Sequence, residues 1–131
     1  MTAICNKENM RLFVEALLSG EYEQGRGRLK LITPEGVKHC CLGVACEVAL
    51  QNGVELEVET SSEGVVFFDQ TSLYLPEAMR EWLGLSPGPK SYSLLLGANN
   101  SAIRMNDTIG TSFEEIAIAI RNHYLLEDVE D

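Results

Sequence analysis

One segment of the chain alternates strictly between apolar and acidic side chains, Val54-Glu55-Leu56-Glu57-Val58-Glu59. An alternation with a period of two predicts a β-strand that has one buried face and one face in water. Turn-forming residues follow at 60–64, and the apolar run at 65–68 can return as the second strand of a hairpin. This segment therefore favours folds that contain an antiparallel sheet.

A second hairpin is predicted earlier in the chain. Residues 28–33 alternate between basic and apolar side chains, and Thr33-Pro34-Glu35-Gly36 has the composition of a turn. Residues 37–41 can return as the second strand of this hairpin. A helical pattern over 42–52 separates the two hairpins, so the chain lacks the regular strand–helix alternation of a doubly wound fold.

Further helices are predicted at both ends of the chain. Asn6 can cap a helix that runs to about Ser19, and Ser112-Phe113-Glu114-Glu115 is a capping box for the last helix. Shorter helices are expected over 76–83 and 100–105. The side chains expected in the core are Met10, Phe13, Val14, Leu17, Leu18, Leu42, Ala45, Cys46, Val48, Ala49, Phe113, Ile116, Ala117, Ile120 and Tyr124, with Tyr74 and Trp82 as aromatic anchors.

Size and composition agree with one globular unit. The chain has 131 residues, of which 45% are hydrophobic and 23% charged, and such a chain can bury a core without metal or disulfide. We therefore expect a single domain over residues 1–131 with a frayed acidic tail at 127–131. The predicted class is α+β, with a mainly antiparallel sheet of about four strands in two hairpins and helices packed on one face.

The overall charge is strongly negative. Twenty acidic and ten basic side chains give a net charge of −10, which repels DNA, RNA and anionic membranes. The first residues show no secretory signal, and no apolar run is long enough for a membrane span. The four cysteines are then expected to stay reduced. These features predict a cytoplasmic protein with no direct contact to nucleic acid and none to a membrane.

The positive charges are concentrated in one segment. Residues 24–46 contain Arg26, Arg28, Lys30 and Lys38 against a single acidic side chain, for a net charge of +3. The remaining residues hold six basic and nineteen acidic side chains, for a net charge of −13. An acidic chain thus carries a cationic segment in its first predicted hairpin and in the approach to that hairpin.

The run Gln24-Gly25-Arg26-Gly27-Arg28 has the features of an anion site. Glycines let backbone N–H groups approach a ligand closely, and arginines offer planar pairs of donors. The helix expected from Leu42 adds partial positive charge near the same end of the hairpin. The run is neither a Rossmann fingerprint, since no strand precedes it and the third glycine is missing, nor a P-loop. In the alternative interpretation, the basic residues form a solvated strand face and the glycines only a turn.

A second polar segment is included in the predicted site. Asn106-Asp107 precedes the last helix, where an Asx-type turn is the default interpretation and a polar contact to the site is the other. The ligand expected is small and phosphorylated, or else the contact is a single carboxylate-rich site on a partner. The predicted ligand-binding residues are Gln24, Gly25, Arg26, Gly27, Arg28, Lys30, Asn106 and Asp107.

Cysteines at the end of the cationic segment raise the question of metal or thiol chemistry. His39-Cys40-Cys41 and Cys46 lack the Cys-x-x-Cys pairs of zinc sites, so no metal and no cofactor are expected. Cys40 or Cys41 at a helix N-terminus is a candidate nucleophile with His39 as its base. Packing in the core is the alternative, and it is the common fate of reduced cysteine.

The acidic face of the predicted 54–59 strand offers a different kind of surface. Glu55, Glu57 and Glu59 repeat at intervals of two residues and so form a strip. Such a strip can imitate the phosphate backbone of a nucleic acid. A solvated sheet edge, protected from aggregation by its charges, is the alternative.

Three parts of the chain resemble a family of small accessory proteins of phages and prophages. They are residues 17–29 with the Gln-Gly-Arg-Gly-Arg-Leu run, residues 40–46 with the Cys-Cys-Leu-Gly-Val run, and a pattern that joins Leu75-Pro76 to Asn106-Asp107 and to residues 112–117. The resemblance spans most of the chain. It implies a phage-type accessory protein in the host cytoplasm, without an established activity, catalytic set or ligand.

The function predicted from these features is non-catalytic. The chain is expected to bind and sequester a small phosphorylated or nucleotide-like ligand, in the setting of counter-defence. The first alternative is an acidic protein that inhibits a host enzyme by mimicking a nucleic acid. The second alternative is a small cysteine-dependent hydrolase. The sequence does not fix the oligomeric state. One arrangement found in small ligand-binding proteins is a homo-oligomer that builds its site between subunits.

Overall fold

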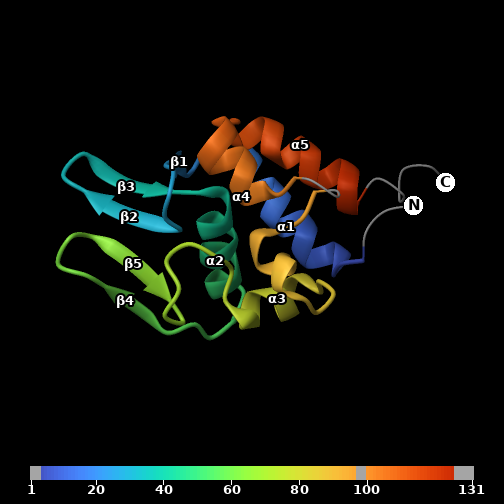
Figure 1. Cartoon of the computed structure of the whole chain (residues 1–131), viewed down its shortest axis with the longest axis horizontal. Coiled ribbons are helices and arrows are strands. Elements are labelled where there is room, and N and C mark those ends of the chain that lie inside the picture. The colour runs from blue at the N-terminus through green and yellow to red at the C-terminus, as the bar shows by residue number, and fades with distance from the viewer. Residues whose placement is uncertain (1–3, 97–99, 126–131) are drawn as a thin grey trace.

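The computed structural model describes residues 4–96 and 100–125, and the acidic tail predicted at 127–131 lies outside these residues (Figure 1). The helices and strands, in chain order, are α1 (Lys7–Leu18), β1 (Glu23–Gln24), β2 (Lys30–Thr33), β3 (Gly36–His39), α2 (Cys41–Gln51), β4 (Val58–Thr60), β5 (Val65–Phe68), α3 (Glu77–Leu83), α4 (Ala102–Arg104) and α5 (Phe113–Tyr124). A 3₁₀ helix at Pro89–Ser93 and a π-helix at Met105–Ile109 complete the set.

The strands form one five-stranded sheet in the order β1-β3-β2-β5-β4. The neighbours β3 and β2, β2 and β5, and β5 and β4 are antiparallel, whereas the two-residue β1 runs parallel to β3. The helices α1, α3, α4 and α5 gather at one end of the molecule, and the two hairpins project from the opposite end. α2 lies between the hairpins and these four helices (Figure 1). The predicted α+β class and the mainly antiparallel sheet are confirmed, and β1 adds one strand to the four expected.

The two long terminal helices begin at the predicted caps. The side-chain Oδ1 of Asn6 accepts the N–H of Asn9 at 3.0 Å, and the Oγ of Ser112 accepts the N–H of Glu115 at 3.2 Å. Each bond satisfies a backbone donor that the helix itself leaves unpaired. α1 lies against α5, and it also contacts α2 and α3, so its apolar face closes the core from one side.

The buried side chains form one cluster that contains nearly all of the predicted core. Trp82 is partly buried and packs against this cluster, as expected of an anchor. Two predictions were wrong, because Leu18 is 48% exposed and Tyr74 is 50% exposed. Leu18 is the last residue of α1 and points about 100° away from Leu17, outside the stripe that faces the core.

α2 is the central helix of the molecule, and every residue from Cys41 through Cys46 is buried. A Cβ placed on Gly43 would lie 1.7 Å from the backbone oxygen of Leu29. The same oxygen accepts the N–H of Cys40 at 3.1 Å. The Cys-Cys-Leu-Gly run is therefore the place where the helix packs directly on the backbone that follows the glycine–arginine run.

The strand predicted over 54–59 is largely absent, since β4 begins only at Val58. β5 ends at Phe68, and the chain turns away at Asp69, which has a φ of 50°. Residues 54–56 consequently have no strand opposite them with which to pair. Val54 and Leu56 nevertheless pack against the core as the alternation predicted, whereas Val58 is 46% exposed.

The short helix predicted over 100–105 is α4, which widens directly into the π-helix. Ser101 caps α4 by accepting the N–H of Arg104 at 3.1 Å. Gly110 ends the π-helix with a φ of 81°, a left-handed conformation that favours glycine. This irregular segment buries Asn106 completely and leaves Asp107 half-buried at the protein surface.

Candidate functional site

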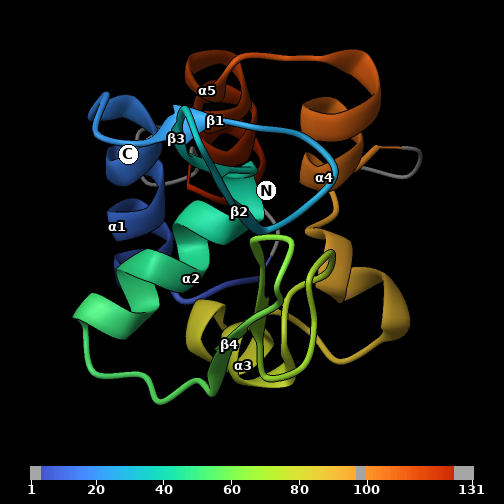
Figure 2. The same cartoon turned by 90° about the vertical axis from the view of Figure 1, so that its left-hand side faces the viewer.

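Residues 24–28 comprise the end of β1 and most of the loop that leads to β2, and this loop reaches across to the region of α4 (Figure 2). The N–H of Gly25 donates to the backbone oxygen of His39 at 2.7 Å. A Cβ on Gly25 would lie 2.8 Å from the Cβ of Lys38, so a larger residue would push the loop away from β3. Gly27 has a φ of 85°, which reverses the direction of the loop.

Asn106 holds this loop from the interior of the protein. Its Nδ2 donates to the backbone oxygen of Gly25 at 2.9 Å and to the Oδ1 of Asp107 at 2.7 Å. Its Oδ1 accepts from the Nε2 of Gln24 at 2.8 Å and from the N–H of Cys41, the first residue of α2, at 3.2 Å. Both donors and both acceptor positions of the amide are thus used within the protein, and none is left for a ligand.

Two exposed contacts join the loop to the π-helix. The Oδ1 of Asp107 accepts the N–H of Gly27 at 3.0 Å, and the Nη2 of Arg26 donates to the backbone oxygen of Gly110 at 3.1 Å. The N–H groups of Gly25 and Gly27 therefore already have partners inside the protein. The glycines serve close packing and a left-handed turn, and the expected role of their N–H groups as ligand donors has no support in the structure.

Gln24 ties the loop to the start of α5. Its Nε2 also donates to the backbone oxygen of Thr111 at 2.8 Å, and its Oε1 accepts the N–H of Phe113 at 3.2 Å. Phe113 is the first residue of α5, so Gln24 satisfies one of the helix's unpaired backbone donors. Gln24 thus connects β1, the π-helix and α5 through one side chain.

The two faces of the β2–β3 hairpin have different surroundings. Lys30 and His39 lie directly opposite each other and both contact the Oε2 of Glu47 on α2, at 2.8 and 2.7 Å. The hydrogen bond from His39, helped by Lys30, lowers the pKa of Glu47 to about 2, against the opposing effect of burial. Lys30, one of the predicted ligand-binding residues, is therefore paired on the face that α2 covers.

A hollow of about 360 Å³ opens on the other side of this hairpin, which we call the outer face. The residues that line it are Gln24, Gly25, Arg26, Arg28, Leu31, Thr33, Glu35 and Lys38. Arg26 and Arg28 are exposed, and Arg28 has no hydrogen bond or ion pair with any of the described residues. The Nζ of Lys38 lies 3.6 Å from the Oε1 of Glu23, a loose and solvated pair.

The structure thus brings most of the predicted site together. Gln24, Gly25, Arg26 and Arg28 line the hollow, Gly27 lies between the two arginines, and Asn106 and Asp107 hold the loop from behind. Lys30 points elsewhere, and whether the other residues bind a ligand stays a prediction. The sequence analysis missed Leu31, Thr33, Glu35 and Lys38, although the expected hairpin register places Leu31 and Lys38 opposite each other on one face.

The cysteines next to this site lie in the core. Cys40, Cys41 and Cys46 are each exposed by 1% or less. Burial raises the pKa of the Cys40 thiol to about 12 and the pKa values of Cys41 and Cys46 well above their usual range. A buried, protonated thiol is a poor nucleophile, which counts against a cysteine-dependent hydrolase. Within residues 4–96 and 100–125, no group of three or more His, Cys, Asp or Glu side chains is placed to hold a metal ion.

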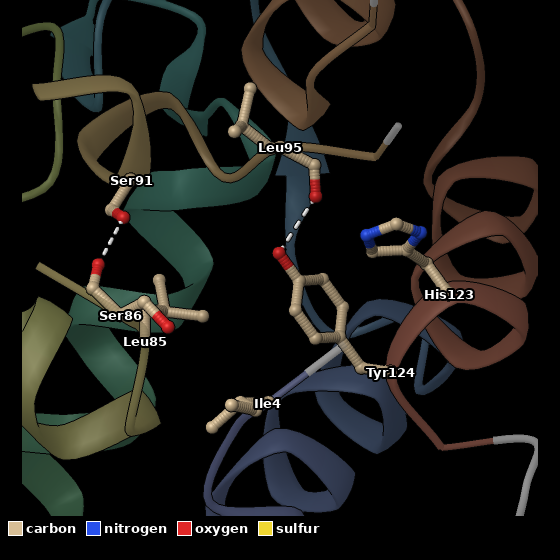
Figure 3. Close-up of a pocket in the computed structure, with 7 residues that line it drawn as sticks. All are labelled: Ile4, Leu85, Ser86, Ser91, Leu95, His123 and Tyr124. Carbon is tan, nitrogen blue, oxygen red and sulfur yellow. Dashed lines mark hydrogen bonds between the residues drawn. The ribbon is translucent and has the colours of Figure 1, made fainter. Parts of the chain in front are cut away.

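A smaller hollow of about 170 Å³ lies where α5 ends (Figure 3). Tyr124 crosses it, with the hydroxyl donating to the backbone oxygen of Leu95 at 2.7 Å, and the His123 ring stands edge-on to Tyr124 (Figure 3). Its described lining includes Ile4 and Leu85 but neither lysine nor arginine. Its described lining therefore lacks the guanidinium and ammonium groups that line the hollow on the outer face.

The comparisons with known proteins bear on the family of the chain. None of the described helices is long and apolar enough to cross a membrane. No curated protein and no solved structure gives a significant match to the chain. A family model described as "Domain of unknown function (DUF8296)" matches residues 5–124, a range that includes every described helix and strand. The chain therefore belongs to the family of the domain of unknown function DUF8296.

Proposed function

We propose that the protein binds a small phosphorylated or nucleotide-like molecule in the hollow between residues 24–28 and the outer face of the β2–β3 hairpin. The observation that carries the proposal is the convergence of Arg26, Arg28 and Lys38 on one hollow, in a chain of net charge −10. Guanidinium groups offer paired donors to phosphate oxygens, and an ammonium adds a point charge. A volume of about 360 Å³ is within the range of small-molecule sites.

The rigidity of the loop supports the same proposal. Buried Asn106 and half-buried Asp107 fix residues 24–27 from behind, and they take no space in the hollow. A ligand that meets a loop already in place does not have to supply the free energy of ordering it. The backbone on either side of Arg26 is thus held in place, so the loop meets the ligand in an ordered conformation.

We propose that the ligand is held without turnover. Among its described lining residues the hollow has no serine, cysteine or histidine, and the Thr33 hydroxyl donates to the backbone oxygen of Gly36 at 2.8 Å. A nucleophile paired with a base is the minimum for covalent catalysis. Sequestration fits this arrangement better, and the resemblance to phage and prophage accessory proteins suggests counter-defence as its setting.

Direct binding measurements test the proposal. Thermal-shift and calorimetric titration of the purified protein would use pyrophosphate, nucleoside mono- and triphosphates and cyclic dinucleotides. We expect at least one class to bind, and we expect Arg26→Ala and Arg28→Ala each to weaken it about tenfold or more. Arg121→Ala is the matched control, because Arg121 is an exposed arginine on α5 outside the hollow. Absence of binding across the panel, or equal losses in all three variants, would contradict the proposal.

A second candidate function uses the acidic residues before and within β4. Glu55, Glu57 and Glu59 are all exposed, and β4 is the edge strand of the sheet. We propose, as the alternative, that this acidic edge occupies a basic groove on a host enzyme. Capture from host lysate at low and high salt would test it. A partner retained equally by the protein with all three glutamates changed to glutamine would rule out the edge as the contact.

A further inference from the structure

The hollow on the outer face is polarised along the hairpin. Arg26 and Arg28 lie at the end where the loop enters β2, whereas Glu35 lies in the turn that joins β2 to β3. The four residues of β2 separate these ends by on the order of 10 Å, at about 3.3 Å per residue. Among the described lining residues, Glu35 at the far end is the one carboxylate, and the Glu23 carboxylate that pairs with Lys38 lies nearby.

Glu35 has no ion pair with any described residue that would explain its position. Its charge opposes the binding of a ligand that is anionic throughout, such as phosphate or pyrophosphate. A carboxylate is instead an acceptor for hydroxyl or amine groups, as in the contact between an acidic residue and ribose in dinucleotide sites. Both ends of the hollow are used only by a ligand with a phosphoryl group at one end and neutral donors at the other.

Apolar side chains lie between the two ends, beside Lys38 on β3. Leu31 lines the hollow, and Val65 lies directly opposite it on the same face of β5. Phe67 follows Val65 by two residues on that face, and all three side chains are half-buried. A flat apolar ring placed between the cations and Glu35 would remove part of this surface from water.

We infer that Glu35 is a specificity residue and that the ligand is a nucleoside phosphate. Its phosphoryl group would contact Arg26 and Arg28, and a ribose hydroxyl or base amine would donate to Glu35. The base would lie over Leu31. This inference rests on the proposed function and narrows it, because inorganic phosphates and polyphosphates satisfy only one end of the hollow.

The test compares two kinds of probe on one variant. The four common nucleoside 5′-monophosphates and inorganic pyrophosphate are titrated calorimetrically into the wild-type protein and into Glu35→Gln. We expect a nucleoside monophosphate to bind more tightly than pyrophosphate to the wild type. Glu35→Gln should weaken that nucleotide about tenfold, since a charged acceptor is lost, and should leave pyrophosphate binding equal or stronger.

Glu63→Gln is the matched control, because Glu63 is an exposed glutamate in the turn of the other hairpin, between β4 and β5. It should change neither affinity, and equal thermal midpoints would show that both variants are folded. Pyrophosphate binding at least as tight as any nucleotide, or equal effects of Glu35→Gln on both probes, would overturn the inference while the proposed function stands. Absence of binding by both probes in the wild type would contradict the inference, and the nucleoside triphosphates and cyclic dinucleotides of the wider panel would then decide whether the proposed function stands.

Discussion

The side-chain amide of Asn106 donates a hydrogen bond of 2.9 Å to the backbone oxygen of Gly25, 81 positions earlier in the chain. The same amide accepts the first N–H of α2, at Cys41. One buried side chain thus fixes both the glycine–arginine loop and the start of the central helix. The positions of Arg26 and Arg28 depend on a residue that does not line the hollow.

Replacing Asn106 by alanine should destabilise the protein strongly. The change leaves the Gly25 oxygen and the Cys41 N–H without their partner and removes one of the two acceptors of the Gln24 Nε2, in a place where Asn106 is 0% exposed. Unpaired buried polar groups of this kind cost about 3 kcal/mol or more in total. Urea denaturation followed by circular dichroism measures the loss. Asn122→Ala, on the exposed side of α5, should change the free energy of unfolding by less than about 0.5 kcal/mol.

Substitutions of Asp107 distinguish the effect of loop order on ligand affinity from the effect of charge. Asp107→Ala removes a negative charge near the hollow, which by electrostatics alone would strengthen anion binding. It also removes the acceptor for the Gly27 N–H, and we expect affinity to fall about three- to tenfold as the loop loosens. Asp107→Asn keeps an acceptor oxygen and should retain the affinity. A calorimetric titration in which Asp107→Ala binds the anion more tightly than wild type would refute the positioning role.

The sequence predicted the elements that depend on local rules and missed the contacts that join them. The caps at Asn6 and Ser112 rest on bonds within one helical turn, and both are present. Residues 54–56 failed as a strand because β5 turns away at Asp69, which no local pattern in 54–59 can reveal. Alternation correctly described burial there, since Val54 and Leu56 pack against the core.

For the candidate site, too, local patterns were predicted and long-range contacts were missed. Clustering of charge located residues 24–28, but the hydrogen bond between Gln24 and Asn106 spans 82 positions and has no periodic signature. The charge of Lys30 was counted with that of Arg28, because alternation with a period of two puts residues 28 and 30 on one strand face. In the structure β2 begins only at Lys30, which contacts Glu47 on α2, whereas Arg28 lies in the loop before the strand.

Gly43→Ala tests the contact between α2 and the chain leaving the loop. A single methyl group would have to lie 1.7 Å from the Leu29 oxygen, so the helix must shift. Forcing an atom into such a packed contact costs about 3 kcal/mol or more. Gly20→Ala is the control, since Gly20 has a φ of 79° but open space around it, and only backbone strain of about 1 kcal/mol applies. Similar losses in the two variants would contradict the close-packing account.

The stability supplied by Glu47 should depend on pH. Contacts with His39 and Lys30 lower its pKa from 4.5 to about 2, so the charged form stabilises the folded state above the ordinary pKa. That contribution, about 2 kcal/mol or more, is lost as the pH falls from about 4.5 toward 2. The gap in unfolding free energy between wild type and Glu47→Gln should therefore be constant near neutral pH and shrink below about pH 4.5.

Denaturant titrations at a series of pH values would measure this gap. Glu59→Gln is the matched control, because Glu59 is exposed on the edge strand, and its gap should stay near zero throughout. A Glu47→Gln gap that does not change between neutral pH and pH 3 would show that the charge of Glu47 is not what stabilises the hairpin against α2.

The most direct test of the anion site is a residue-resolved titration of the ¹⁵N-labelled protein with pyrophosphate, followed by heteronuclear NMR. The proposal predicts chemical-shift changes at the backbone amides of residues 26–28, at Leu31 and Lys38, and at the side-chain Nε of Arg26 and Arg28. The backbone amide signals of Glu47, on the face of the hairpin that α2 covers, and of Tyr124, in the smaller hollow where α5 ends, should not shift. Changes centred on Tyr124, or no change around Arg26 and Arg28 at saturating pyrophosphate, would contradict the assignment of the site.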